Sequence, residues 1–136
     1  MATTDLVPTA DLVITNWSST DTTHYTEIDE EIDSPSTADK IYHTVDSESE
    51  EVGLTNAPAD YGTCNTVTLR VNGKASADMG FTADLCKADD TVLASVAFVG
   101  GVDTSQSTKT SGAQAATLSS ADVDALKIVF TTVAVV

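Results

Sequence analysis

The sequence predicts an all-β fold, a single antiparallel β-sandwich with jelly-roll-like connections. Apolar residues recur in short runs that alternate with Thr, Ser and other polar residues, and there is almost no helical periodicity. Eight or nine such runs, separated by turn-rich segments, follow one another at the spacing typical of sandwiches and jelly rolls. The 136 residues, of which 41% are hydrophobic, are enough for one domain with its own core.

The strand pattern covers most of the chain, and the last strand is the most apolar. The expected strands are Leu12–Asn16, Tyr25–Asp29, Lys40–Val45, Val52–Thr55, Asn65–Asn72, Met79–Lys87, Val92–Val99, a weak one at Ala113–Leu118, and Lys127–Val135. The segment 100–112 is expected to be a turn-rich connection. Part of the last strand is apolar on both faces, which predicts a central strand or one covered by a partner.

The segment LSSADVDAL, residues 118–126, interrupts the β pattern. Ser119 or Ser120 can serve as the N-cap of a helix, with Asp122 in its first turn and apolar residues on one side. The sequence therefore predicts one short helical turn near 119–126.

The clearest strand register is predicted within residues 64–87. Apolar residues alternate with polar ones on both sides of a turn near Ala75. If the two strands form a hairpin, a shared apolar face requires that Leu69 pairs with Phe81. If consecutive strands lie in opposite sheets, this pairing does not apply.

The same register brings Cys64 opposite Cys86 on the outward face. Cross-strand cysteines at such a site can form a disulfide when the pair is not hydrogen-bonded. The alternative is two reduced thiols in a protein made in the cytoplasm.

The charge of the chain is strongly negative. Twenty-one acids oppose six bases, for a net charge of −15. Such a chain has few groups that could replace the counterions of nucleic acid, so no nucleic-acid partner is expected. The N-terminus lacks a basic region followed by an apolar run, and no segment reaches the ~18 apolar residues of a membrane span. We expect a protein without a membrane partner, soluble in a saline environment.

The acids are densest in YTEIDEEIDSPSTADKIY, residues 25–42. An EF-hand loop beginning at Asp29 would need Gly at its sixth position and Glu at its twelfth, but these are Ser34 and Lys40. No cofactor is therefore expected, and zinc-ligand spacing is absent. A looser calcium site remains an option; its ligands would be Asp29, Glu30, Asp33 and Asp39.

No pattern in the sequence indicates catalysis. Paired carboxylates can hydrolyse glycosides only within a cleft, and no aromatic-lined groove for a sugar is apparent. There is no GxSxG motif or phosphate-binding glycine loop. We therefore expect a non-enzymatic protein.

Several single residues have a structural interpretation. Trp17 is expected in the core at one end of the sandwich, with a sugar-binding platform as the alternative. His24 and His43 are expected at the surface. The acidic run DSESEE, residues 46–51, is expected to be a solvated turn before Val52.

Together these segments resemble a small β-sandwich domain of tailed-phage virions, found among capsid decoration (cement) proteins. The resemblance covers residues 11–136. It rests on Trp17, Tyr25-x-x-Ile28-Asp29-Glu30, Asp39-x-Ile41-Tyr42, Val67-x-Leu69-x-Val71 and LSSADVDALKIVF. It implies a jelly-roll-like sandwich without catalytic activity that binds and stabilises the capsid exterior. The major capsid protein is the implied partner, with self-association as a further option, and the virion surface is the implied location.

Two segments are expected to meet the partner. Residues 1–10 form an extended N-terminal arm ahead of the domain at 11–136, because Pro8 disfavours a helix. Within the arm the contact residues would be Thr4, Leu6, Val7 and Pro8. The apolar C-terminal tail can pair into a sheet or interface through Val133, Val135 and Val136. The alternative function is a carbohydrate- or receptor-binding module of a virion fibre or cell-surface protein.

Overall fold

The fold is all-β in a computed structural model that describes residues 5–14, 17–19, 23–25, 28, 40–43, 45–58 and 62–135. This confirms the predicted fold class, while the sandwich with jelly-roll connections stays a prediction. The elements are β1 (Pro8–Val13), β2 (Ser18–Ser19), β3 (Ile41–Tyr42), β4 (Ser49–Leu54), β5 (Cys64–Val67), β6 (Arg70–Gly73), β7 (Met79–Cys86), β8 (Val92–Phe98), β9 (Ser107–Thr110), β10 (Gln114–Leu118), α1 (Ser120–Asp124) and β11 (Lys127–Ala134).

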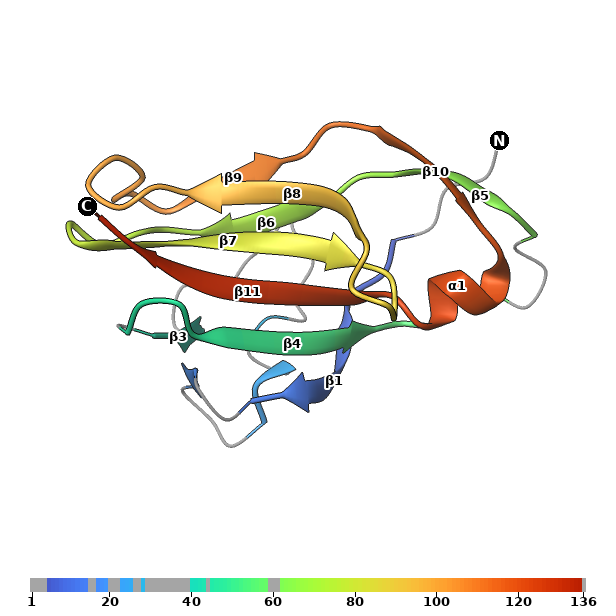
Figure 1. The fold of residues 1–136 in the computed structure, drawn as a ribbon, viewed down its shortest axis with the longest axis horizontal. Helices are drawn as coiled ribbons and strands as arrows, with labels where there is room; N and C mark the ends of the chain where they lie inside the picture. Colours follow the sequence, from blue (N-terminus) through green and yellow to red (C-terminus); the bar gives the residue numbers. More distant parts are fainter. Residues whose placement is uncertain are drawn as a thin grey trace.

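The main sheet has five antiparallel strands in the order β1-β4-β11-β7-β8. The last strand of the chain, β11, lies at its centre, as its two-sided apolar pattern predicts (Figure 1). Phe130 of β11 pairs with Ala83 of β7 and with Glu50 of β4. Because side chains alternate between the faces of a strand, these three residues share one face of the sheet. That face is directed into the core.

Residues 64–73 do not form a hairpin with β7, so the predicted pairing of Leu69 with Phe81 is wrong. Instead β5 pairs with β10 and β6 pairs with β9, while β7 pairs with β8 and β11. The hairpin prediction failed because it assumed that consecutive strands pair. The predicted alternation is nevertheless correct, since Leu69 is buried in the same core as Phe81.

The limits of several strands differ from the predicted ones. The strand β9 falls in the segment 100–112 that was expected to be a connection, because its Thr- and Ser-rich sequence resembles a loop. The strand β1 begins at Pro8, so the last three residues of the predicted arm belong to the main sheet. Tyr25 and Ile28 lie outside strands, and the rest of the segment 25–29 is outside the described residues.

The predicted helical turn is confirmed as α1. Its N-cap is Ser119, whose hydroxyl accepts a hydrogen bond from the backbone N–H of Asp122. The carboxylate of Asp122 in turn accepts one from the backbone N–H of Ser119, which completes a capping box. The helix lies at the end of β11 opposite the chain's C-terminus (Figure 1).

The core combines side chains of the main sheet with those of the short strands and α1. Trp17 is 7% exposed and packs with Phe81 and Phe130, at ring-centroid distances of 6.0 and 5.8 Å. The prediction that Trp17 is a core residue is thus confirmed. Its indole N–H donates to the backbone oxygen of Glu48, which satisfies the one polar atom of the ring.

Candidate functional site

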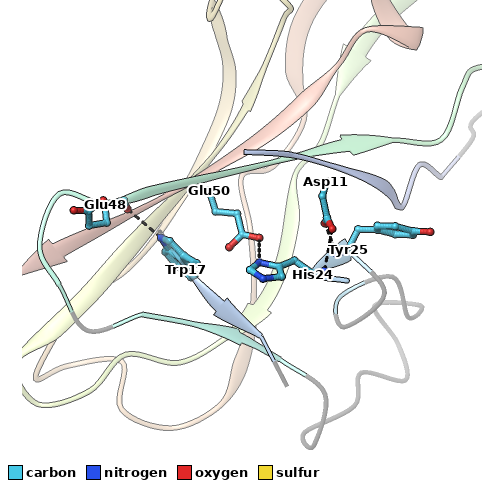
Figure 2. Close-up of polar contacts among 6 residues, drawn as sticks. All are labelled: Asp11, Trp17, His24, Tyr25, Glu48 and Glu50. Carbon is cyan, nitrogen blue, oxygen red and sulfur yellow. Dashed lines mark hydrogen bonds and ion pairs between the residues drawn. The ribbon is translucent and has the colours of Figure 1, made fainter. Parts of the chain in front are cut away.

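A carboxylate and an imidazole meet in the interior of the protein. Glu50 is 0% exposed and His24 is 8% exposed, and the Nδ1 atom of His24 lies 2.5 Å from Oε1 of Glu50 (Figure 2). Glu50 lies on the inward face of β4 together with Val52 and Leu54. Full burial of a Glu side chain is rare unless it is paired. The contact with His24 supplies that pairing.

Asp11 of β1 positions the segment that carries the histidine. Its two carboxylate oxygens accept hydrogen bonds from the backbone N–H groups of His24 and Tyr25, at 3.1 and 2.8 Å (Figure 2). This carboxylate therefore ties the segment to the edge of the sheet. With His24 held in place, its ring reaches Glu50 in the next strand.

The environment of Glu50 favours its protonated form. Burial raises the pKa of the Glu50 carboxyl above its ordinary value, and the hydrogen bond and charge of His24 oppose that rise. The other carboxylate oxygen of Glu50, Oε2, has no hydrogen-bond partner among the described residues. Because the side chains of His24 and Glu50 are 10% and 0% exposed, the pair lies in the interior and joins the segment of His24 to β4.

Two predictions about these residues are wrong. His24 is buried, whereas it was expected at the surface. The run 46–51 is not wholly a solvated turn, because β4 begins at Ser49 and turns Glu50 inward. Glu50, Val52 and Leu54 recur at every second position, and this strand pattern could have shown that Glu50 points inward. It was outweighed by the acidity of the run.

A cavity of about 530 Å³ lies beside the buried indole, and its lining includes Trp17, Ile41, Tyr42, His43, Lys74 and Thr104. The ring of His43 stacks on that of Trp17 at 6.3 Å. His43, expected at the surface, is half-buried, and its Nε2 atom is buried without a hydrogen bond to a described residue. The ring of Tyr42 is 46% exposed, with the Lys40 ammonium 5.8 Å from its centroid.

A second hollow, of about 270 Å³, lies at the C-terminal end of β11, and we call it the C-terminal trough. Its lining includes Gly80, Thr82, Val99, Gly100, Val133 and Val135. The three valines are 51%, 48% and 51% exposed, respectively, so the trough is open and apolar. The trough contains Val133 and Val135 of the predicted C-terminal contact, whereas Val136 is outside the described residues.

Glycine is required where the strands approach one another at the trough. A β-carbon on Gly80 would overlap the backbone oxygen of Phe98, and one on Gly100 would overlap the side chain of Val135. Any larger residue at either position would push the strands apart. A glycine within a strand pattern indicates such a close approach, but it does not show which segment approaches.

The residues expected to form an arm partly contact the chain's own sheet. The backbone N–H of Val7 donates to the hydroxyl of Thr55 at 2.9 Å, and the backbone N–H of Thr55 donates to the backbone oxygen of Val7, also at 2.9 Å. Leu6 packs against the core and Pro8 is the first residue of β1. The strand β1 spans residue 10, where the arm was expected to end. Thr4 lies outside the described residues.

The two cysteines do not face each other across a strand pair. Cys64 of β5 pairs with Leu118, whereas Cys86 of β7 pairs with Lys127 and Val92. Both are buried, Cys64 within the core cluster and Cys86 on the face of β7 that also carries Asp84, and both thiols are free. The predicted cross-strand register is therefore wrong, since the two strands are not neighbours.

The calcium option falls on Asp29, Glu30, Asp33 and Asp39, which all lie outside the described residues. In the part of the chain that the structure describes, no group of three or more His, Cys, Asp or Glu residues is arranged to hold a metal ion. Within that same part, no helix is long and apolar enough to cross a membrane. Comparisons of the chain with protein-family models, with curated proteins and with solved structures found no match.

Proposed function

We propose that this chain is a non-enzymatic structural protein of a phage virion, which binds the capsid exterior and stabilises it. The C-terminal trough carries this proposal, because it is an open apolar surface on a chain with a net charge of −15. Exposed apolar patches on soluble domains mark sites of protein association. The high negative charge opposes non-specific aggregation of the free protein.

The packing of the trough suits a role in binding. Its walls are strands β7, β8 and β11 of the main sheet, joined by continuous antiparallel pairing. A surface built on a hydrogen-bonded sheet changes little on binding, so little conformational entropy is lost. A capsid accessory protein needs such a preformed surface, since it must hold many shell subunits in fixed positions.

The proposal identifies the major capsid protein as the partner and the virion surface as the location. It is tested by adding the purified protein to capsids that lack it and sedimenting the mixture. We expect saturable binding to mature shells and a higher temperature of shell disruption in the presence of the protein. A protein that stays in the supernatant with every shell tested would refute the capsid function.

A carbohydrate- or receptor-binding module is the second candidate. One observation favours it, namely the cavity of about 530 Å³ with the exposed ring of Tyr42 at its edge. Stacking on an aromatic ring is a common way to bind a sugar, but Trp17 is too buried to provide one. A glycan-binding screen tests this function, and binding that Tyr42→Ala abolishes would favour it over the capsid proposal.

A further inference from the structure

We propose that the C-terminal trough receives an apolar side chain from a partner segment in which Lys or Arg residues flank that side chain. This inference rests on the proposed function and specifies the chemistry of the partner. Three observations support it: the shape of the trough, the exposure of its valines, and the carboxylates beside it.

The shape follows from the two glycines. Gly80 of β7 pairs with Val133 of β11, and it presents no side chain next to that valine. Gly100 approaches Val135 so closely that a β-carbon there would overlap it. The resulting hollow of about 270 Å³ is lined by these two glycines together with Val99, Val133 and Val135. A space of this size accommodates an aliphatic side chain.

The rest of the same sheet face is different in character. At the other end of β11, Lys127 Nζ lies 2.6 Å from a carboxylate oxygen of Glu51 and 2.5 Å from one of Asp90. Between the two ends, the hydroxyls of Ser49 and Thr131 contact each other at 3.1 Å. The trough differs from this polar stretch because it gathers three half-exposed valines, and their burial by a partner would stabilise a complex.

Two carboxylates accept hydrogen bonds from backbone groups beside the trough. Asp46 accepts a hydrogen bond from the backbone N–H of Ala134 at 2.8 Å, and Asp103 accepts one from Val99 at 2.6 Å. The backbone oxygen of Asp78, whose residue is exposed, accepts one from Val135. Lys109 compensates only one of these charges, through its contact with Asp103 at 2.8 Å.

This arrangement distinguishes a basic partner from a second copy of the chain. Two copies joined at their troughs would bring the Asp46 and Asp103 carboxylates of each copy close to those of the other, which is unfavourable. A partner with Lys or Arg on either side of an apolar side chain would pair with them. Charge complementarity thus favours a partner whose apolar residue is flanked by basic ones.

The main test is a pair of variants that introduce the same charge at two ends of the sheet. Val133→Lys places a cation in the trough, whereas Val92→Lys places one at a valine that is 53% exposed at the far end of β8. We expect Val133→Lys to weaken binding to shells at least about tenfold and Val92→Lys to change it less than about twofold. Equal binding by the two variants would overturn the inference while leaving the capsid function intact.

A second measurement does not depend on shells. Peptides with a central valine flanked by lysines, and matched peptides with glutamates, are titrated into the isotope-labelled protein. We expect the amide signals of Gly80, Val99 and Val133 to shift with the lysine peptide and not with the glutamate peptide. The inference would be refuted if the shifts lay elsewhere, if both peptides acted equally, or if neither peptide caused a shift.

The two tests separate the possible failures. If the protein binds no shell but the lysine peptide occupies the trough, the capsid function fails and the inference stands. If the wild-type protein is a dimer that Val133→Lys dissociates, the occupant is a second copy and the inference fails. Circular dichroism of each variant confirms that it is folded, which is expected because both valines are about half exposed.

Discussion

His24 and Glu50 form a contact of 2.5 Å between Nδ1 and Oε1 inside the protein, although they are 26 positions apart in the sequence. The pair attaches a segment near the N-terminus to the inner face of β4. Asp11 accepts a hydrogen bond from the backbone N–H of His24, and Phe130 of β11 is the cross-strand neighbour of Glu50. The stability of the fold should therefore depend on the protonation of Glu50.

Glu50→Gln is expected to raise stability at neutral pH. The pKa of Glu50 is raised above its ordinary value of 4.5, mainly by burial. A carboxyl whose pKa is raised in the folded protein stabilises the fold when the pH is below its pKa in the unfolded chain. This contribution is lost as the pH rises through its pKa in the folded protein. Glutamine keeps an oxygen for His24 without the charge. We expect the free energy of unfolding to rise by about 1 kcal/mol near neutral pH and to change little near pH 4.

Urea unfolding followed by the fluorescence of Trp17, the one tryptophan of the chain, measures this difference. Glu48→Gln, in the partly exposed residue just before β4, is the matched control and should show no comparable pH dependence. A variant at Glu50 that is destabilised more at neutral pH than at acid pH would contradict the assignment.

His24→Leu is expected to be strongly destabilising, because it leaves the carboxylate of Glu50 buried without a partner. The expected loss at neutral pH is about 3–5 kcal/mol, and it should shrink at acid pH as Glu50 becomes protonated. The double variant His24→Leu/Glu50→Leu removes both polar groups and should recover most of the loss. A double variant as unstable as the sum of the two single changes would show that the residues do not interact.

Ser119→Ala is expected to lower the free energy of unfolding by about 1 kcal/mol, because it removes one of the two reciprocal hydrogen bonds of the capping box. The same change one position later, Ser120→Ala, is the control, since Ser120 is an exposed helix residue outside the cap. Thermal unfolding of the two variants should separate them by a few degrees. Equal melting temperatures would argue against the cap.

The two thiols are expected to react slowly in the native protein. Cys64 and Cys86 are buried, and burial, followed by the charge of Asp84, raises the pKa of the Cys86 thiol. The thiolate is the reactive form, so both effects slow modification by a thiol reagent such as Ellman's. Two thiols per chain should react after denaturation without reductant. If none reacts, the cysteines form a disulfide and the free-thiol assignment is wrong.

Local signals in the sequence were sufficient for the elements near the C-terminus. A serine at 119 or 120 with Asp122 in the first turn predicted α1, and the two-sided apolar run of β11 predicted a central strand or one covered by a partner. Both depend on residues close together in the chain. The burial of Trp17 was also predictable, because a large ring gains most from leaving water.

The candidate sites depended on contacts between distant segments. Glu50 belongs to an acidic run, and only the approach of His24 explains why it is inside. The trough combines β7, the turn after β8 and the end of β11, and no local pattern shows that Gly80 lies beside Val133. The register of Cys64 and Cys86 failed for the same reason.

By itself, the sequence determined that the chain is all-β, which residues within 64–87 face the core, and that a short helical turn begins at Ser119 or Ser120. These features follow from the period of two in a strand and from capping within one turn. Only the tertiary structure decided which strands pair, that β9 exists, and that His24 and Glu50 are buried together. Strand pairing joins residues far apart in the chain, and many registers satisfy the same alternation, so packing of the whole core selects among them.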